Sequence, residues 1–83
     1  MGRHEQLLAR ICEGRAVKNI AFADVCALLR RLGFAERQRG SHHIFTRSGI
    51  VERINLQSSD ADAKPYQIRQ IRAIVLRHRL SLP

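Results

Sequence analysis

The spacing of the apolar residues changes abruptly at Gly33. Before it, FADVCALLRRLGF carries apolar residues at the i, i+3, i+4 and i+7 spacing of a helix with one apolar face, namely Val25, Leu28, Leu29 and Leu32. Gly33 follows the last of them, where a residue in the left-handed conformation commonly ends a helix. After Gly33 the period falls to about two, which is the period of a strand. The sequence therefore predicts an α+β fold in which a helix precedes a sheet.

Three short segments after Gly33 have the composition of strands. They are AERQR (35–39), HHIFT (42–46) and IVERINL (50–56). In the third, Ile54 and Leu56 share one face with Glu52, while Arg53 belongs to the other face. The turn before this segment contains Gly49, a residue that readily takes a positive φ. We expect a three-stranded antiparallel meander.

Two further helices are predicted outside this region. Residues 3–13 place apolar side chains on one helical side, and Gly14 ends the run. Pro65 stands where the first turn of a helix tolerates proline, and residues 65–78 follow with one apolar arc that includes His78. We expect His78 to pack against the core. The predicted order is α-α-β-β-β-α, in two layers with the helices on one face of the sheet.

The size of the chain limits what it can enclose. Its 83 residues are expected to form one domain (1–83), too small for a deep pocket, so no cofactor and no small-molecule substrate are expected. No apolar run approaches the roughly 20 residues that span a bilayer. The N-terminal stretch lacks a signal-peptide pattern. Cys12 and Cys26 form no CxxC pair, so two semi-buried thiols in a cytoplasmic protein are expected.

The charge is strongly positive and is carried mainly by arginine. The formal net charge is +8, and thirteen of the 15 basic residues are arginine. The planar guanidinium group binds phosphate through two hydrogen bonds and stacks on bases, which favours a nucleic-acid partner. An acidic membrane surface or an acidic protein would attract the same charge, so the charge alone leaves these alternatives open.

Two of the four histidines are adjacent, in RGSHHIF (39–45). Metal binding, core packing and acid–base chemistry are three possible roles. Neighbouring residues in a strand point to opposite faces, so His42 and His43 cannot bind one metal ion together. No acidic residue or cysteine lies at ligand spacing around them in the sequence, and no metal is expected. One of the two histidines should pack toward the helices and the other should face solvent; the alternation does not tell which.

The run LLRRLGF (28–34), five further residues and GSHHIF (40–45), followed by a third strand and a basic helix, resembles the HicA family of bacterial toxins. These toxins are the mRNA-cleaving half of HicA–HicB toxin–antitoxin modules. The resemblance covers residues 22–80 and implies the α-β-β-β-α fold of double-stranded-RNA-binding domains. Residues 3–14 would then be an extra N-terminal helix that packs on the core, mediates dimerisation or docks a partner.

The resemblance also implies the site. In the family the histidine of the GSH element is catalytic, and here that position is His42. Histidine transfers protons near neutral pH, and RNA supplies its own 2′-hydroxyl nucleophile, so cleavage needs no metal. Gly40 and Ser41 would approach the phosphate, and Arg39 or Lys64 would balance the developing charge. The residues predicted to bind RNA or to stabilise its phosphate are Arg37, Arg39, Gly40, Ser41, Lys64, Arg69 and Arg72.

The resemblance also implies the partners of the protein, and one alternative function remains open. The resemblance implies a metal-independent mRNA endoribonuclease that is neutralised by a HicB-like antitoxin covering His42. The alternative is a non-catalytic RNA- or DNA-binding module on the same fold. The feature that separates the two is His42, because a protein that only binds has no need of an acid–base group beside a Gly-Ser turn.

Overall fold

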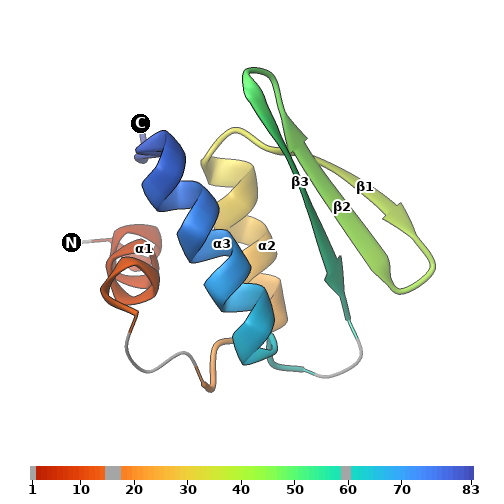
Figure 1. The fold of residues 1–83 in the computed structure, drawn as a ribbon. Coiled ribbons are helices and arrows are strands. Elements are labelled where there is room, and N and C mark those ends of the chain that lie inside the picture. Colours follow the sequence, from red (N-terminus) through yellow and green to blue (C-terminus); the bar gives the residue numbers. More distant parts are fainter. Residues whose placement is uncertain (1, 15–17, 59–60) are drawn as a thin grey trace.

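A computed structural model of the chain describes residues 2–14, 18–58 and 61–83 (Figure 1). Its elements are α1 (Arg3–Glu13), α2 (Phe22–Arg31), β1 (Ala35–Arg39), β2 (His42–Arg47), β3 (Ile50–Gln57) and α3 (Pro65–His78). The strands form an antiparallel sheet in the order β1-β2-β3. The predicted α+β class and the α-β-β-β-α order of a double-stranded-RNA-binding domain, preceded by one extra helix, are confirmed.

The change of period at Gly33 coincides with the end of α2. Gly33 has a φ of 94°, in the left-handed region that glycine enters without steric cost. Its N–H donates to the carbonyl of Arg30 at 3.0 Å, and the N–H of Phe34 donates to the carbonyl of Leu29, also at 3.0 Å. These bonds end the helix, and the side chain of Phe34 that follows is buried in the core. The chain then enters β1.

The core lies between the sheet and the pair α2 and α3, which cover the same face of it (Figure 1). Phe45, Ile54 and Leu56 are fully buried on the inner face of the sheet. Glu52 shares that face, as the alternation predicts, and its carboxylate lies at the margin of the core. It accepts hydrogen bonds from Arg77 at 2.6 Å and pairs with Nε2 of His78 at 2.7 Å.

His78 is therefore partly buried, as expected, and its contact is a polar one. Its side chain is 24% exposed, and the carboxylate of Glu52 satisfies its ring nitrogen. The same hydrogen bond, together with a backbone bond and Arg77, lowers the pKa of the Glu52 carboxyl. The pair fastens the C-terminal end of α3 to β3.

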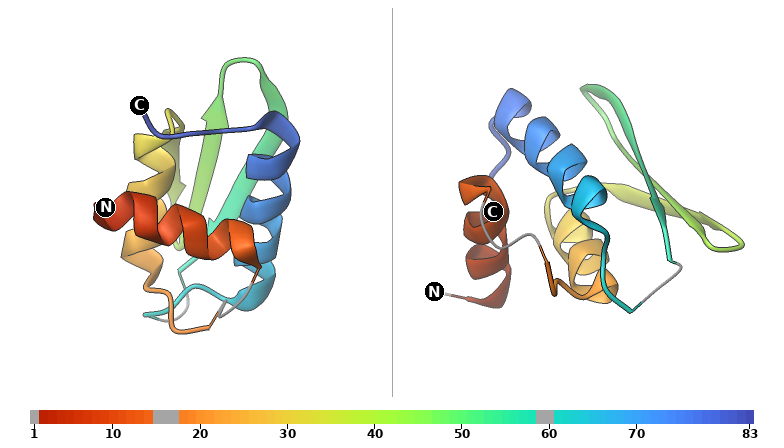
Figure 2. Two further views of the ribbon diagram at one scale, coloured as in Figure 1. Left: turned by 90° about the vertical axis from the view of Figure 1, so that its left-hand side faces the viewer. Right: turned by 60° about the horizontal axis from the view of Figure 1, so that its bottom comes forward.

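The helix α1 lies on the side of α2 and α3 that is away from the sheet and crosses both of them (Figures 1 and 2). Its Ile11 is fully buried. Nε of Arg72 donates to the carbonyl of Cys12 at 3.2 Å and ties α1 to α3. The molecule thus has three layers, where the sequence predicted two. Of the roles left open for the extra helix, packing on the core is observed.

Both cysteines are free thiols, Cys12 half-buried and Cys26 buried. None of the helices in the described ranges is long and apolar enough to cross a membrane.

Candidate functional site

The strand register places the two adjacent histidines on opposite faces of the sheet. His43 pairs with Leu56 of β3 and shares the inner face with Phe45, and its side chain is 13% exposed. His42 lies on the outer face, opposite Arg39 of β1 and Gln57 of β3, and is exposed. The choice that the alternation left open is thus resolved: His43 packs toward the helices and His42 faces solvent.

The turn before His42 is a two-residue hairpin loop, Gly40-Ser41, between Arg39 and His42. Gly40 has a φ of 57°, and a positive φ at the first loop residue alone is the pattern of a type II′ turn. A Cβ atom on Gly40 would meet nothing within 4 Å. The backbone conformation therefore favours glycine here, and the open space around it leaves the turn accessible to a ligand.

The end of β3 beside His42 is fixed by hydrogen bonds. The N–H of Ser58 donates to the carbonyl of Ser41 at 2.9 Å. Gln67 of α3 is fully buried; its Nε2 donates to the carbonyl of Gln57 at 3.3 Å, and its Oε1 accepts from the N–H of Lys64 at 3.0 Å. These bonds join the start of α3, with Lys64, to the strand end that pairs with His42.

Gln67 was not among the predicted site residues. The sequence did contain a signal for it: Gln67 stands next to Ile68, a residue of the apolar arc of the last helix, where a polar side chain is unusual. A buried amide requires partners for its donor and its acceptor, and both are supplied here by the backbone.

The outer face of the sheet carries exposed basic side chains on both strands that pair with β2. Arg37 and Arg39 of β1 lie on it with His42, and all three residues are exposed. Arg53 of β3 alternates onto the same face and is exposed as well. Arg53 was not predicted as a site residue, although its place on the face opposite Glu52 follows from the alternation. These four residues, Arg37, Arg39, His42 and Arg53, are called the basic outer face below.

Three of the predicted RNA contacts lie at the start of α3 or on it, away from the basic outer face, because α3 covers the inner face of the sheet; they are Lys64, Arg69 and Arg72. Arg69 and Arg72 of α3 line a shallow pocket together with Glu13 and Gly14, at the C-terminal end of α1. Arg72 is partly buried, and its guanidinium is engaged with the carbonyl of Cys12. The structure therefore groups Arg39, Gly40, Ser41 and His42 at one end of the sheet and separates these two arginines from them.

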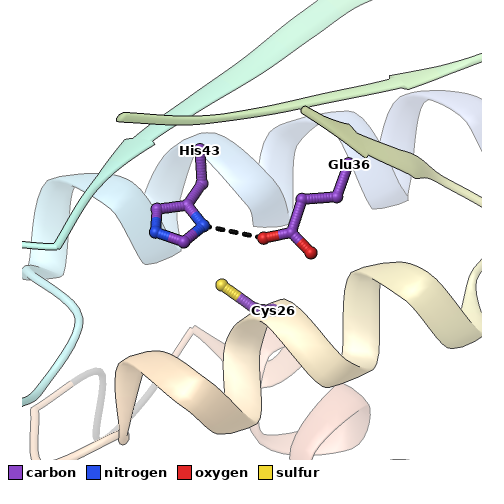
Figure 3. Close-up of side chains that lie close together, drawn as sticks. All are labelled: Cys26, Glu36 and His43. Carbon is purple, nitrogen blue, oxygen red and sulfur yellow. Dashed lines mark hydrogen bonds and ion pairs between the residues drawn. The ribbon is translucent and has the colours of Figure 1, made fainter. Parts of the chain in front are cut away.

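Behind the sheet, His43 belongs to a second polar cluster (Figure 3). Its Nδ1 and Oε2 of Glu36 are 2.7 Å apart, and its ring lies edge-on to Phe22 with the ring centroids 5.1 Å apart. The hydrogen bond with His43, followed by the contacts of Arg30, lowers the pKa of the Glu36 carboxyl. Burial, with a further contribution from Glu36, raises the pKa of the adjacent Cys26 thiol to about 11. A thiol with such a pKa keeps its proton at neutral pH and is a poor nucleophile.

The match to a protein family follows the boundaries of this fold. Residues 22–78 match the family described as HicA toxin of bacterial toxin–antitoxin. The matched range begins at the first residue of α2 and ends at the last residue of α3. The chain belongs to the HicA toxin family. No curated protein and no solved structure matches it significantly.

Membership of the HicA family confirms the resemblance seen in the sequence. It makes the chain the toxin of a bacterial toxin–antitoxin module and implies an antitoxin partner. The family match covers the whole α-β-β-β-α unit and leaves α1 outside it, so α1 is an addition to the HicA core.

Proposed function

We propose that this HicA toxin is a metal-independent endoribonuclease that cleaves mRNA in the cytoplasm and uses His42 as its acid–base group. The observation that supports the proposal best is the position of His42. It is exposed, it lies directly across from Arg39, and it follows the open turn Gly40-Ser41. A proton-transfer group, a cation and an accessible turn thus meet at one end of the sheet.

The proposed reaction needs only these groups and the RNA. His42 removes the proton of the 2′-hydroxyl, whose oxygen attacks the adjacent phosphorus, and the bond to the 5′-oxygen of the next nucleotide breaks. His42 then donates its proton to that 5′-oxygen, and the products are a 2′,3′-cyclic phosphate and a 5′-hydroxyl. Arg39 stabilises the negative charge that develops on the phosphate oxygens, and Ser41 offers them its hydroxyl.

Binding of the RNA strand is assigned to the basic outer face. Arg37, Arg39 and Arg53 follow the sheet on the same side as His42, so a phosphate backbone lying across the strands passes the proposed catalytic group. Lys64, at the start of α3, is exposed, and we assign to it a contact with RNA that continues past the end of β3 beside His42. Arg69 and Arg72 would contact only RNA that continues around the molecule to α3.

The proposed antitoxin is a HicB-like protein that covers His42. The basic outer face is exposed, and Val51, which alternates onto the same side of β3 as Arg53, is 93% exposed. A partner with acidic groups opposite the arginines and an apolar contact for Val51 would complement it. Such a partner would exclude RNA from the same surface.

The test is cleavage of RNA by His42→Ala beside the parent protein, both in EDTA. We expect the rate to fall by roughly 10²–10⁴-fold, which is the usual contribution of a positioned acid–base group. RNA affinity should be retained, because the arginines remain. Thr46→Ala is the matched control, since Thr46 is exposed on the outer face of the same strand.

Three results would change the proposal. Unimpaired cleavage by His42→Ala would remove His42 from the reaction. Loss of the parent's cleavage in EDTA would contradict metal independence. A parent protein that binds RNA and does not cleave it would favour the non-catalytic binding module.

A further inference from the structure

Three side chains with metal-binding atoms converge behind the sheet, on the face opposite His42 (Figure 3). They come from three elements: Cys26 from α2, Glu36 from β1 and His43 from β2. The sulfur, one carboxylate oxygen and one ring nitrogen all lie within 4.8 Å of one another. We propose that these residues form a binding site for Zn²⁺ or a similar thiophilic divalent ion, with water as the fourth ligand. The inference is independent of the proposed function.

The distances suit a small tetrahedral ion. Zinc bonds to sulfur, nitrogen and oxygen are about 2.0–2.3 Å long, which places the ligand atoms of a tetrahedron roughly 3.3–3.8 Å apart. Nδ1 of His43 and Oε2 of Glu36 are closer than this, at 2.7 Å, and share a hydrogen bond. An entering ion would replace that hydrogen bond, separate the two atoms slightly and draw the Cys26 sulfur inward. Because the three atoms already lie within 4.8 Å of one another, reaching these separations takes side-chain movements on the order of 1 Å.

The charges also balance. A thiolate and a carboxylate together carry two negative charges, which neutralise Zn²⁺ and avoid an uncompensated charge in a partly buried site. One proton leaves the thiol of Cys26 for the solvent, while neutral His43 binds through Nδ1 and carries its proton on Nε2. No electron is transferred and no other reactant is needed.

The surroundings hold the ligands in place and leave a route for the ion. The other carboxylate oxygen of Glu36, Oε1, accepts a hydrogen bond from Arg30 and so orients the carboxylate. Phe22 packs against the ring of His43. The side chains of Glu36 and His43 are 20% and 13% exposed, which gives the ion and the fourth ligand access from their side, whereas Cys26 is buried.

This site was not anticipated because the three ligands are not close in the sequence. The absence of acidic residues and cysteines around the two histidines in the chain led to the expectation of no metal. The pairing of β1 with β2 brings Glu36 to His43, and the packing of α2 against the sheet brings Cys26 to both. An ion here would connect α2 to two strands and would stabilise the fold.

The experiment is titration of the metal-free full-length protein with Co²⁺, followed by its displacement with Zn²⁺. A cobalt–thiolate bond gives a charge-transfer absorption in the near ultraviolet, which reports a sulfur ligand directly. We expect this absorption in the parent and in Cys12→Ser, and its loss on addition of Zn²⁺. The chain has two cysteines, Cys12 and Cys26. If the charge-transfer absorption persists in Cys12→Ser, the sulfur ligand is therefore Cys26, and no further variant is needed for this assignment.

Two more variants complete the assignment. Cys26→Ala should lose the absorption while circular dichroism shows a folded protein. Arg30→Ala should keep it with an affinity weaker by roughly 10–100-fold, the usual effect of removing a group that orients a ligand. Absence of the absorption in the parent would overturn the proposal, and so would its loss in Cys12→Ser or its persistence in folded Cys26→Ala.

Discussion

Replacement of His43 by alanine should destabilise the protein far more than the same change at its neighbour His42. The side chain of His43 is 13% exposed and bonds to the carboxylate of Glu36 at 2.7 Å. A hydrogen bond to a charged group contributes about 1.5–3 kcal/mol. The edge contact with Phe22 adds about 0.5–1.5 kcal/mol. The expected loss for His43→Ala is therefore about 2–4 kcal/mol, against less than about 1 kcal/mol for exposed His42.

The assay is thermal and urea unfolding of the parent and both variants, with EDTA present so that no bound ion contributes. In a domain of this size 1 kcal/mol shifts the Tm by about 4–8 °C. We expect His43→Ala to lower the Tm by roughly 10–30 °C and His42→Ala by a few degrees. Equal losses for the two variants would refute the assignment of the faces, and so would a larger loss at His42.

Three further outcomes are expected. Hydrogen bonds lower the pKa of the Glu36 and Glu52 carboxyl groups below the ordinary 4.5. The stability that these two carboxylates contribute is therefore fully present above pH 4.5 and is lost as the pH falls through their pKa values in the folded protein. The urea midpoints at pH 7 and pH 3 should differ less in a Glu36→Gln, Glu52→Gln double variant than in the parent. Arg72→Ala removes the bond to the Cys12 carbonyl and should cost about 0.5–1.5 kcal/mol, with faster amide exchange in α1, whereas exposed Arg69→Ala should change little. RNA affinity should fall by orders of magnitude between about 50 and 200 mM salt if six or more phosphates are contacted, and a flat response would contradict electrostatic binding.

The elements of the fold were predictable because each is determined by local rules. The apolar spacing of α2, the glycine after it and the alternation along β3 depend on residues a few positions apart. The same alternation correctly predicted that Glu52 shares the face of Ile54 and Leu56 and that Arg53 lies on the other face. It could not say which histidine faces inward, because His42 and His43 each have an apolar residue two positions further along. The pairing of Phe45 with Ile54 decides it, and pairing is a tertiary property.

The contacts between elements could not be read from the sequence for a similar reason. Arg72 was among the residues predicted to bind RNA. In the structure Arg72 contacts α1, and its Nε donates to the backbone carbonyl of Cys12, 60 residues earlier in the chain. Charge patterns identify which side chains avoid the core; they do not show whether another helix covers them.

The position of β2 explains how so small a domain can hold two chemically different clusters. As the central strand it is paired on both edges, so the backbone groups of its two histidines are largely fixed by the sheet. One histidine can therefore contribute to stability on the inner face while its neighbour stays exposed for chemistry on the outer face. Mutations of Cys26, Glu36 or His43, on the inner side of the sheet, should affect His42 mainly by changing how stably β2 is folded. A change in cleavage that exceeds the change in the folded fraction would then indicate a direct effect at His42.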